Sequence, residues 1–345
     1  MTVPADDSAW LVRPASRRED GAGHVARCLA LASALDGPVR FLLDPESPWA
    51  GRIEAAGFGC DEEDHPAGTT QSLRALAEPR ARGLILDGYD FAPVDAAALA
   101  RAGFLVRILD DGEPGDARAV INPNPGAESM VCRPAPALVL AGPRYALLDA
   151  RFQAAGRPDR NRGAAGEDRL RHLLVSMGGR DSRNATGLAL DAIEAMKTRA
   201  SVDILLPWTA DHIDAVTARI ANLPRATLHV DVENPVPFLD AADLAVGAGG
   251  VSLAERMCRG LPAVIVALAP NQAGPARAAA DAGAVCYAGE IQALAARTLA
   301  ATIDRLLADR GTLARMRDAG RRLVDGRGAV RAARALETAR RETAA

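Results

Sequence analysis

Aromatic residues and lysine are scarce in this chain. Only 3% of its 345 residues are Phe, Trp or Tyr, and arginine carries almost all of the positive charge because Lys197 is the sole lysine. The formal net charge of −3 argues against nucleic acid as the main partner, since binding to phosphates requires a basic surface. Because 49% of the residues are hydrophobic, the chain can build large cores, which Ala, Leu and Val have to fill.

Cysteine is also sparse and irregularly spaced. The five cysteines are Cys28, Cys60, Cys132, Cys258 and Cys286. Their odd number and the absence of a CxxC pair argue against a zinc site or a disulfide framework and fit reduced cytosolic thiols. No hydrophobic run reaches the roughly 18 residues of a membrane span, and the start MTVPADDSAWLVRP lacks the regions of a signal peptide. We therefore expect a soluble cytoplasmic protein without membrane insertion, and the sequence leaves its oligomeric state open.

Short hydrophobic runs alternate with alanine-rich helical segments, which predicts parallel sheets covered by helices on both faces. In the first half, strands are expected at 9–14, 39–44, 83–90, 104–111, 119–124 and 136–148, and helices at 24–35, 49–56 and 94–102. In the second half, strands are expected at 172–179, 201–208, 226–232, 244–249, 262–268 and 284–289, and helices at 185–196, 210–223, 252–260, 271–283 and from 291 onward.

The polar stretch 153–169, rich in Gly, Arg and Asp, separates the two series and is typical of a linker or an exposed loop. The sequence therefore predicts two doubly wound α/β domains, 1–152 and 170–345, that face a cleft. The last helix is a candidate for packing back on the first domain. Domains of this class bind ligands at the carboxyl ends of their strands, so we expect the site there.

The segment GAGHVARCLALASAL, residues 21–35, places two glycines and a histidine where the first strand leads into a helix. Gly21 and Gly23 permit a tight turn and a close approach to a ligand, and the N-terminus of a helix favours an anion. A histidine here can act as a general base near neutral pH. His24 is therefore a candidate catalytic base, although a histidine that only caps the helix gives the same pattern.

The turn SMGGRDSRNATG, residues 176–187, follows the first strand of the second half. Gly178 and Gly179 can present backbone N–H groups to phosphate oxygens, and Asn184 leads into the next helix. The turn lacks the lysine of a P-loop and the spacing of a dinucleotide fingerprint. A plain strand-to-helix turn is the alternative.

A second glycine-rich turn opens GAGGVSLAERMCRGLP, residues 247–262. Gly249 and Gly250 precede a helix that Ser252 can cap. The helix N-terminus suits a pyrophosphate, and Glu255 near its start can accept hydrogen bonds from ribose hydroxyls. The alternative is that the acid only complements the helix dipole.

Two further groups of polar residues follow strands. In APNQAG, residues 269–274, the side chains of Asn271 and Gln272 can bind a sugar or cap a helix. Four residues end neighbouring strands of the first half: Asp87, Tyr89, Asp110 and Asp111. The carboxylates suggest either a divalent metal or, more modestly, contacts that order loops, and we expect no metal.

Taken together, these motifs resemble the UDP-sugar hydrolases of the pseudaminic acid pathway, which are relatives of the N-acetylglucosaminyltransferase that makes lipid II. The matching segments are GAGHVARCLALA, LILDGYDF, ILDDGEPGDARAVINPN, LAGPRYALLDARF, LLVSMGGRDSRNATGLAL, DLAVGAGGVSLAERMCRGLP, NQAG and LVDGRGAVRAARAL. They occur in the family's order from about residue 13 to residue 336. Any one of these segments is a weak signal, whereas the ordered set is specific to the superfamily and fairly specific to the hydrolases.

The resemblance implies two Rossmann-like domains of the glycosyltransferase-B type and an inverting hydrolysis without cofactor or metal. Water would replace UDP on UDP-2,4-diacetamido-2,4,6-trideoxy-β-L-altropyranose, and the partner is this small molecule alone. His24 would be the base, and Tyr89 and Asn271 would help to place the water or the sugar. The resemblance also implies substrate contacts from Arg13, Gly21, Gly23, Gly178, Gly179, Asn184, Phe238, Gly249, Gly250, Val251, Ser252, Glu255 and Gln272. Among these, residues 249–252 would hold the pyrophosphate, Glu255 the ribose and Phe238 the uracil.

One departure from the family concerns the start of the first motif. Relatives carry an aspartate in a pattern such as RxDxSxxxGxGH, whereas this chain reads RPASRREDGAGH, with Ala15 at the aspartate position. Glu19 or Asp20 is available to compensate. An inverting UDP-sugar glycosyltransferase and a nucleotide-sugar binding protein without catalysis are the alternative functions.

Overall fold

The computed structural model describes residues 9–62, 81–89, 104–110, 115, 117–133, 135–153, 172–197 and 200–344. The chain forms two compact units: unit 1 comprises Met1–Asp149 and Arg327–Ala345, and unit 2 comprises Ala150–Gly326. The sequence predicts domains 1–152 and 170–345, with the last helix as a candidate for packing back on the first domain. In the structure, 327–345 clusters with unit 1. The expected helix 94–102 and residues 154–169 of the expected linker lie outside the described residues.

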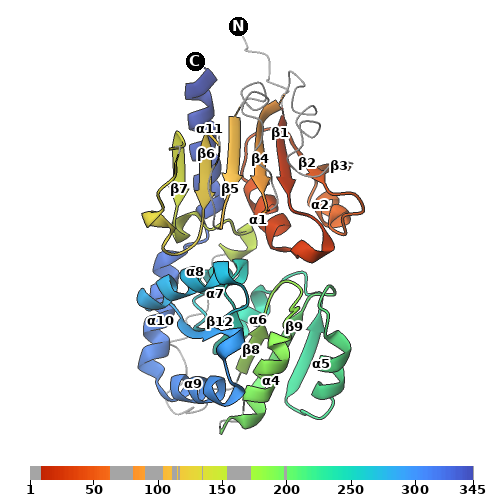
Figure 1. The fold of residues 1–345 in the computed structure, drawn as a ribbon, viewed down its shortest axis with the longest axis vertical. Helices are drawn as coiled ribbons and strands as arrows, with labels where there is room; N and C mark the ends of the chain where they lie inside the picture. Colours follow the sequence, from red (N-terminus) through yellow and green to blue (C-terminus); the bar gives the residue numbers. More distant parts are fainter. Residues whose placement is uncertain are drawn as a thin grey trace. The chain divides into compact units, whose positions relative to one another are not determined.

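Unit 1 contains a parallel sheet of seven strands in the order β3-β2-β1-β4-β5-β6-β7 (Figure 1). The strands are β1 (Ala9–Pro14), β2 (Val39–Leu43), β3 (Gly59–Glu62), β4 (Ala81–Asp87), β5 (Phe104–Ile108), β6 (Ala119–Asn122) and β7 (Leu138–Ala141). The described helices are α1 (Gly23–Ala32), α2 (Ala50–Ala55), α11 (Gly328–Ala344) and the short 3₁₀ turns η1 (Arg18–Asp20), η3 (Ala127–Ser129) and η4 (Pro143–Tyr145). The central strands are continuous hydrophobic runs, as is typical of parallel sheets that are buried on both faces.

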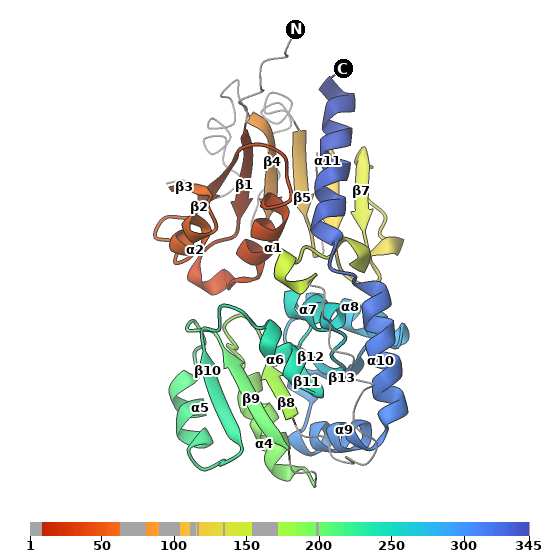
Figure 2. The same cartoon turned by 180° about the vertical axis from the view of Figure 1, so that it is seen from behind.

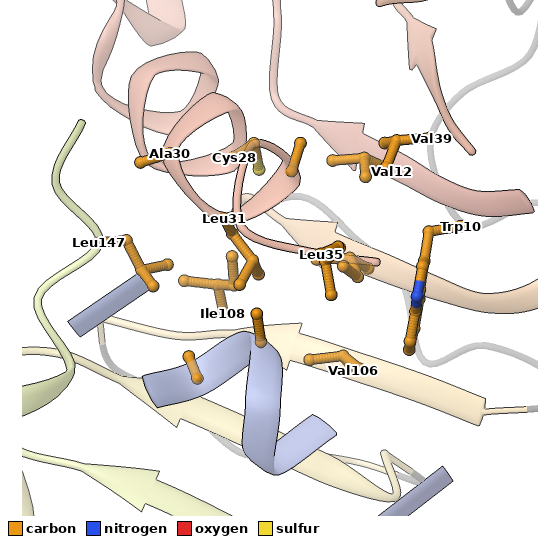
Figure 3. Packing of buried hydrophobic residues seen from close by; sticks show 14 of the residues in the cluster. Trp10, Val12, Cys28, Ala30, Leu31, Leu35, Val39, Val106, Ile108 and Leu147 are labelled. Carbon is orange, nitrogen blue, oxygen red and sulfur yellow. The ribbon is translucent and has the colours of Figure 1, made fainter. Parts of the chain in front are cut away.

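Helices α1 and α11 cover one face of the unit 1 sheet (Figure 2). In Figure 3, Leu31 of α1 points toward Ile108 of β5, and both side chains are at most 1% exposed. The indole Nε1 of Trp10 donates to Oε1 of Glu337 in α11, at 2.8 Å. The C-terminal helix is therefore part of the core of unit 1, held by apolar packing and by one buried hydrogen bond.

Unit 2 contains a parallel sheet of six strands in the order β10-β9-β8-β11-β12-β13. The strands are β8 (His172–Ser176), β9 (Ser201–Leu206), β10 (Ala226–Val230), β11 (Leu244–Ala248), β12 (Ala263–Ala267) and β13 (Cys286–Glu290). The helices are α4 (Ala185–Ala195), α5 (Ile213–Ile220), α6 (Val236–Ala241), α7 (Val251–Arg259), α8 (Pro270–Asp281), α9 (Ala296–Ala308), α10 (Arg310–Leu323) and the 3₁₀ turns η5 (Ala150–Phe152) and η7 (Ile291–Ala293). Helices α4 and α9 share one apolar cluster with the sheet.

The expected order of strands and helices is confirmed in the described part of the chain, with differences at the ends of most elements. Two elements were not expected, the short edge strand β3 and the helix α6. The helical ending consists of α9, α10 and α11. No helix among the described residues combines the length and the hydropathy that a membrane span requires.

Candidate functional site

In unit 1, the candidate base lies where β1 leads into α1. Gly21 has φ 74° and ψ −178°, a backbone conformation that side chains with a Cβ rarely adopt. Helix α1 then begins at Gly23, and no side chain caps its N-terminus. His24 consequently lies in the first helical turn, and its side chain is 8% exposed.

The imidazole of His24 is paired with a buried carboxylate. Its Nδ1 lies 2.7 Å from Oδ1 of Asp87, the last residue of the neighbouring strand β4, which is fully buried. Nη2 of Arg27 also lies 3.1 Å from this Nδ1. The shorter contact decides the tautomer, because an ionised carboxylate can only accept and therefore requires a hydrogen on Nδ1. The lone pair of a neutral His24 is then on Nε2, where it can take a proton.

Arg27 fixes the two carboxylates around His24. Its Nε and Nη2 donate to the two oxygens of Asp87, both at 2.6 Å, and its Nη1 donates to Asp110 at 2.6 Å. Burial alone raises the pKa of Asp87, but the positive charges of Arg27 and His24 outweigh it and hold that pKa below its ordinary value. Burial likewise opposes ionisation of Asp110, and Arg27 again lowers the pKa of this carboxyl well below its usual range. Both acids are therefore ionised at neutral pH.

Tyr89 completes this group. Its ring stands edge-on to the ring of His24, with 5.1 Å between centroids, and its hydroxyl donates to Oδ2 of Asp110 at 2.6 Å. Burial and the charge of Asp110 raise the pKa of the Tyr89 hydroxyl, so it remains a protonated donor. The structure thus places Tyr89 beside His24, and its role toward water or sugar stays a prediction.

The described strand-end carboxylates, for which a metal was the alternative, contact an arginine. Asp87 and Asp110 both bind the guanidinium of Arg27, whose single positive charge offsets one of their two negative charges. No group of three or more His, Cys, Asp or Glu side chains in the described ranges could hold a metal ion. Asp111 lies outside those ranges.

Arg13 is engaged within the protein. Its side chain is 4% exposed, and its guanidinium donates to Oδ1 of Asp44 at 2.9 Å and to the Leu42 carbonyl. Asp44 also accepts from the backbone and the hydroxyl of Ser16. Arg13 thus links β1 to the end of β2 by these hydrogen bonds. Its contact with substrate stays a prediction.

The acids offered as substitutes for the missing aspartate differ in their surroundings. Asp20 accepts a hydrogen bond from the backbone N–H of Arg17 at 2.9 Å. Burial raises the pKa of Asp20, while the Arg17 hydrogen bond and the nearby charge of His24 lower it in part. Glu19 is exposed. The charge of Asp20 interacts with that of His24, and a compensating role for either acid stays a prediction.

In unit 2, the turn between β8 and α4 uses its polar groups to cap the helix. Gly178 and Gly179 have φ of 64° and 43°. The buried carboxylate of Asp181 accepts from the backbone N–H groups of Ala185 and Thr186, at 2.6 and 3.0 Å. Asn184 accepts from the N–H of Gly187 at 3.1 Å. Asn184 is therefore a helix cap, and the carboxylate of Asp181 disfavours an anion at the start of α4.

The turn between β11 and α7 differs because no side chain caps the helix there. Gly250 is the N-cap, and Ser252 is already the second helical residue, so the capping role expected for it is wrong. Instead, the Ser252 hydroxyl accepts from Nη2 of Arg256 at 3.2 Å. The start of α7 therefore fits an anion better than the start of α4 does.

The remaining expected residues lie around this turn. Oε1 of Gln272 accepts from the N–H of Leu268 at 3.0 Å and from the N–H of Gly249 at 3.4 Å, so it links the two turns. Asn271 is the second residue of α8, and Glu255 lies in α7. Both are partly exposed, as is Val251 at the start of α7. Their contacts with a substrate stay predictions.

Phe238, expected beside the uracil, lies in α6. Its ring packs against that of His229 with 4.6 Å between centroids. Nε2 of His229 lies 2.8 Å from Asp203, which also contacts His172 at 2.7 Å. The ring of Phe238 thus packs against His229, which belongs to a polar cluster with Asp203 and His172 on the unit 2 sheet. Its contact with uracil stays a prediction.

Sequence reasoning missed three parts of the site: the pairing of His24 with Asp87, the role of Arg27 and the buried position of Arg256. A signal existed for Arg27, since it follows His24 by three residues and so shares its face of the helix. Asp87 was noted only as a strand-end carboxylate. For Arg256, the sequence held no signal, because arginine is usually exposed.

Comparison with known proteins shows the class of fold. No family model matches the chain. The spore coat polysaccharide biosynthesis protein SpsG of Bacillus subtilis (strain 168) is 27% identical over 201 residues, a match that spans 58% of this chain and 58% of that protein.

MurG of Acinetobacter baumannii superposes with a TM-score of 0.68 at 17% identity, over 96% of this chain and 99% of that one. UGT89C1 of Arabidopsis thaliana, complexed with UDP, gives 0.65 at 13% identity, over 97% and 99%. The two parallel sheets with their helices are the Rossmann-like domains of a glycosyltransferase-B fold.

Proposed function

We propose that this chain hydrolyses a UDP-linked 2,4-diacetamido-2,4,6-trideoxy hexose and releases UDP and the free sugar with inversion, in pseudaminic acid biosynthesis. The observation that carries the proposal is the contact between His24 and Asp87, because it is the arrangement that makes an imidazole a general base. The ordered motifs and the partial match to a polysaccharide biosynthesis protein support the same substrate class.

The chemistry assigned to unit 1 is activation of water. Nε2 of His24 takes a proton from water as the oxygen attacks the anomeric carbon, and Asp87 stabilises the imidazolium that forms. The bond between that carbon and the diphosphate oxygen breaks, and UDP leaves from the opposite face, so the anomeric centre inverts. Tyr89 helps to place the water or the sugar. A positioned general base contributes typically about 10²–10⁴-fold to the rate.

The nucleotide end is assigned to unit 2. The uncapped N-terminus of α7, with Gly249, Gly250, Val251 and Ser252, holds the diphosphate and stabilises the charge that develops on leaving. Glu255 accepts from the ribose hydroxyls, and Asn271 helps to place the sugar. Phe238 flanks the uracil.

An NMR time course tests the proposal. The protein is incubated with UDP-2,4-diacetamido-2,4,6-trideoxy-β-L-altropyranose and EDTA in phosphate-free buffer. We expect release of UDP together with the free sugar of inverted configuration. Tight binding of UDP without any release would refute hydrolysis of this sugar.

An inverting UDP-sugar glycosyltransferase is the second candidate. The His24–Asp87 pair favours it as well, since the same base can deprotonate a hydroxyl of an acceptor in place of water. Adding candidate acceptors separates the two functions. Consumption of the UDP-sugar without free sugar identifies a transferase, whereas a rate independent of acceptor identifies the hydrolase.

A further inference from the structure

Arg256 is a buried cation beneath the turn between β11 and α7. The residue is 1% exposed, although its guanidinium is charged. Its Nη1 donates to the carbonyl of Ala248 at 2.9 Å, and its Nη2 donates to the carbonyl of Ser176 at 2.6 Å. These carbonyls are at the ends of β11 and β8. One guanidinium thus joins both strand-to-helix turns for which the sequence suggested phosphate binding.

A glycine at position 247 leaves the space that the Arg256 side chain occupies. A Cβ at Gly247 would lie 2.1 Å from Nη2 of Arg256 and 2.5 Å from the Ser176 carbonyl oxygen. Only glycine leaves room for the guanidinium between the two strands at this position. The buried cation is therefore matched by a specific feature of the backbone.

The positive charge of Arg256 is poorly compensated. Among the described residues it forms no salt bridge, and its Nε has no hydrogen-bond partner. By contrast, Arg259 in the same helix is paired with both oxygens of Asp240. Burial lowers the pKa of Arg256 to about 10, and the neighbouring charge of Glu255 opposes that shift. A buried charge without a counter-ion is costly, so this position favours the arrival of an anion.

Arg256 also donates hydrogen bonds to two oxygen atoms of the β11–α7 turn, those of the Ala248 carbonyl and the Ser252 hydroxyl. The Ser252 hydroxyl accepts from Arg256 and so keeps its own hydrogen available for donation. The Ala248 carbonyl that accepts from Arg256 belongs to the peptide unit whose N–H is that of Gly249. A hydrogen bond to a carbonyl strengthens its peptide N–H as a donor, and the Gly249 N–H donates to Oε1 of Gln272. The available hydroxyl hydrogen of Ser252 makes the start of α7 a stronger anion site.

We infer that Arg256 is a positioning residue for the diphosphate of the nucleotide, which supplies positive charge from beneath the β11–α7 turn and aligns the donors of that turn. This inference rests on the proposed function, since it assigns the ligand to the same site. If Arg256 has this role, loss of its side chain weakens binding of the phosphate groups and leaves binding of the nucleoside nearly unchanged.

The experiment compares UDP with uridine. Binding of UDP is measured by calorimetry and binding of uridine by NMR titration, for the wild type and for Arg256→Gln. We expect Arg256→Gln to weaken UDP binding at least about tenfold and uridine binding less than about twofold, the scale of losing one charged hydrogen-bonding group. Equal weakening of both ligands would mean a purely structural role, and unchanged UDP binding would also overturn the inference.

A second variant isolates the charge. A buried lysine in Arg256→Lys loses its proton more readily than arginine does. We therefore expect its UDP affinity, relative to uridine, to fall as the pH rises from 7 to 9, while that of the wild type stays constant. A UDP affinity, relative to uridine, that does not change with pH in Arg256→Lys would contradict the inference. This test remains available even where Arg256→Gln does not fold. If the wild type itself binds no UDP, the proposed function fails instead.

Discussion

Nδ1 of His24 lies 2.7 Å from Oδ1 of Asp87, and two nitrogens of Arg27 hold the same carboxylate at 2.6 Å. The pair joins the first turn of α1 to the end of β4, and the two residues are 63 positions apart in the sequence. The orientation of the candidate base is thus fixed by the core of unit 1.

Replacing His24 by alanine tests its role as the base. We expect turnover of the UDP-sugar to fall at least about 10²-fold, with the dissociation constant of UDP changed less than about twofold, because a base acts in the transition state. Steady-state kinetics and calorimetry measure the two quantities. The control is His212→Ala, since His212 precedes α5 without capping it. Turnover in His24→Ala equal to that of the control would exclude the role.

Replacing Asp87 separates orientation from stability. In Asp87→Asn the side chain keeps its size but loses the charge that holds Nδ1–H, so we expect turnover to fall at least about 10²-fold. Asp87→Ala leaves Arg27 and His24 without their buried partner and should lower the free energy of unfolding by about 3–5 kcal/mol. Urea denaturation and kinetics on both variants measure these effects. Wild-type turnover in a folded Asp87→Asn protein would show that the pair does not serve catalysis.

Tyr89→Phe removes only the hydroxyl that donates to Asp110. The residue is 54% exposed, so we expect the free energy of unfolding to change by no more than about 1 kcal/mol. Turnover should fall about tenfold if the hydroxyl places water or sugar. A loss of stability without any loss of turnover would assign Tyr89 a structural role alone.

Stability should decline in acid because of Asp87 and Asp110. Their pKa values are lower in the folded than in the unfolded protein, so the folded state binds fewer protons. The stabilisation is complete above the unfolded pKa of about 4 and is lost as the pH falls from there toward the folded values. Urea denaturation between pH 3 and 7 measures it. Asp110→Asn should show a shallower decline below pH 4 than the wild type, and parallel curves would contradict the assignment.

Glu337 tests the docking of α11. Glu337→Ala leaves the buried indole N–H of Trp10 without its acceptor, which should cost about 1–3 kcal/mol of unfolding free energy. Glu337→Gln keeps an acceptor oxygen and should cost less. The control is Glu342→Ala, which is exposed on the same helix. Equal unfolding free energies for Glu337→Ala and the control would show that this hydrogen bond adds nothing.

Much of the fold follows from the sequence because buried parallel strands are continuous hydrophobic runs. The strands expected at 83–90 and 262–268 correspond to β4 (Ala81–Asp87) and β12 (Ala263–Ala267). The edge strand β3 has the sequence GCDE, which offers no such run, and α6 has only six residues. Tertiary contacts rather than local pattern define these two elements.

The site was predictable only in part. Glycines before helices identified the turns at residues 21–24 and 249–252, because the backbone conformation there depends on local sequence. The pairing of His24 with Asp87 depends on how two distant elements align, which no local pattern encodes. Asn184 accepts from the N–H of Gly187 as a helix cap, and its contact with substrate stays a prediction.

Hydrolysis of the UDP-sugar in H₂¹⁸O tests the central claim most directly, since water activated by His24 must attack the anomeric carbon. The products are analysed by mass spectrometry and by ³¹P NMR. The account predicts ¹⁸O in the free sugar and unlabelled UDP, with both signals lost in His24→Ala. Label in the UDP would mean attack at phosphorus, and undiminished release by His24→Ala would mean another base. Either result would contradict the account.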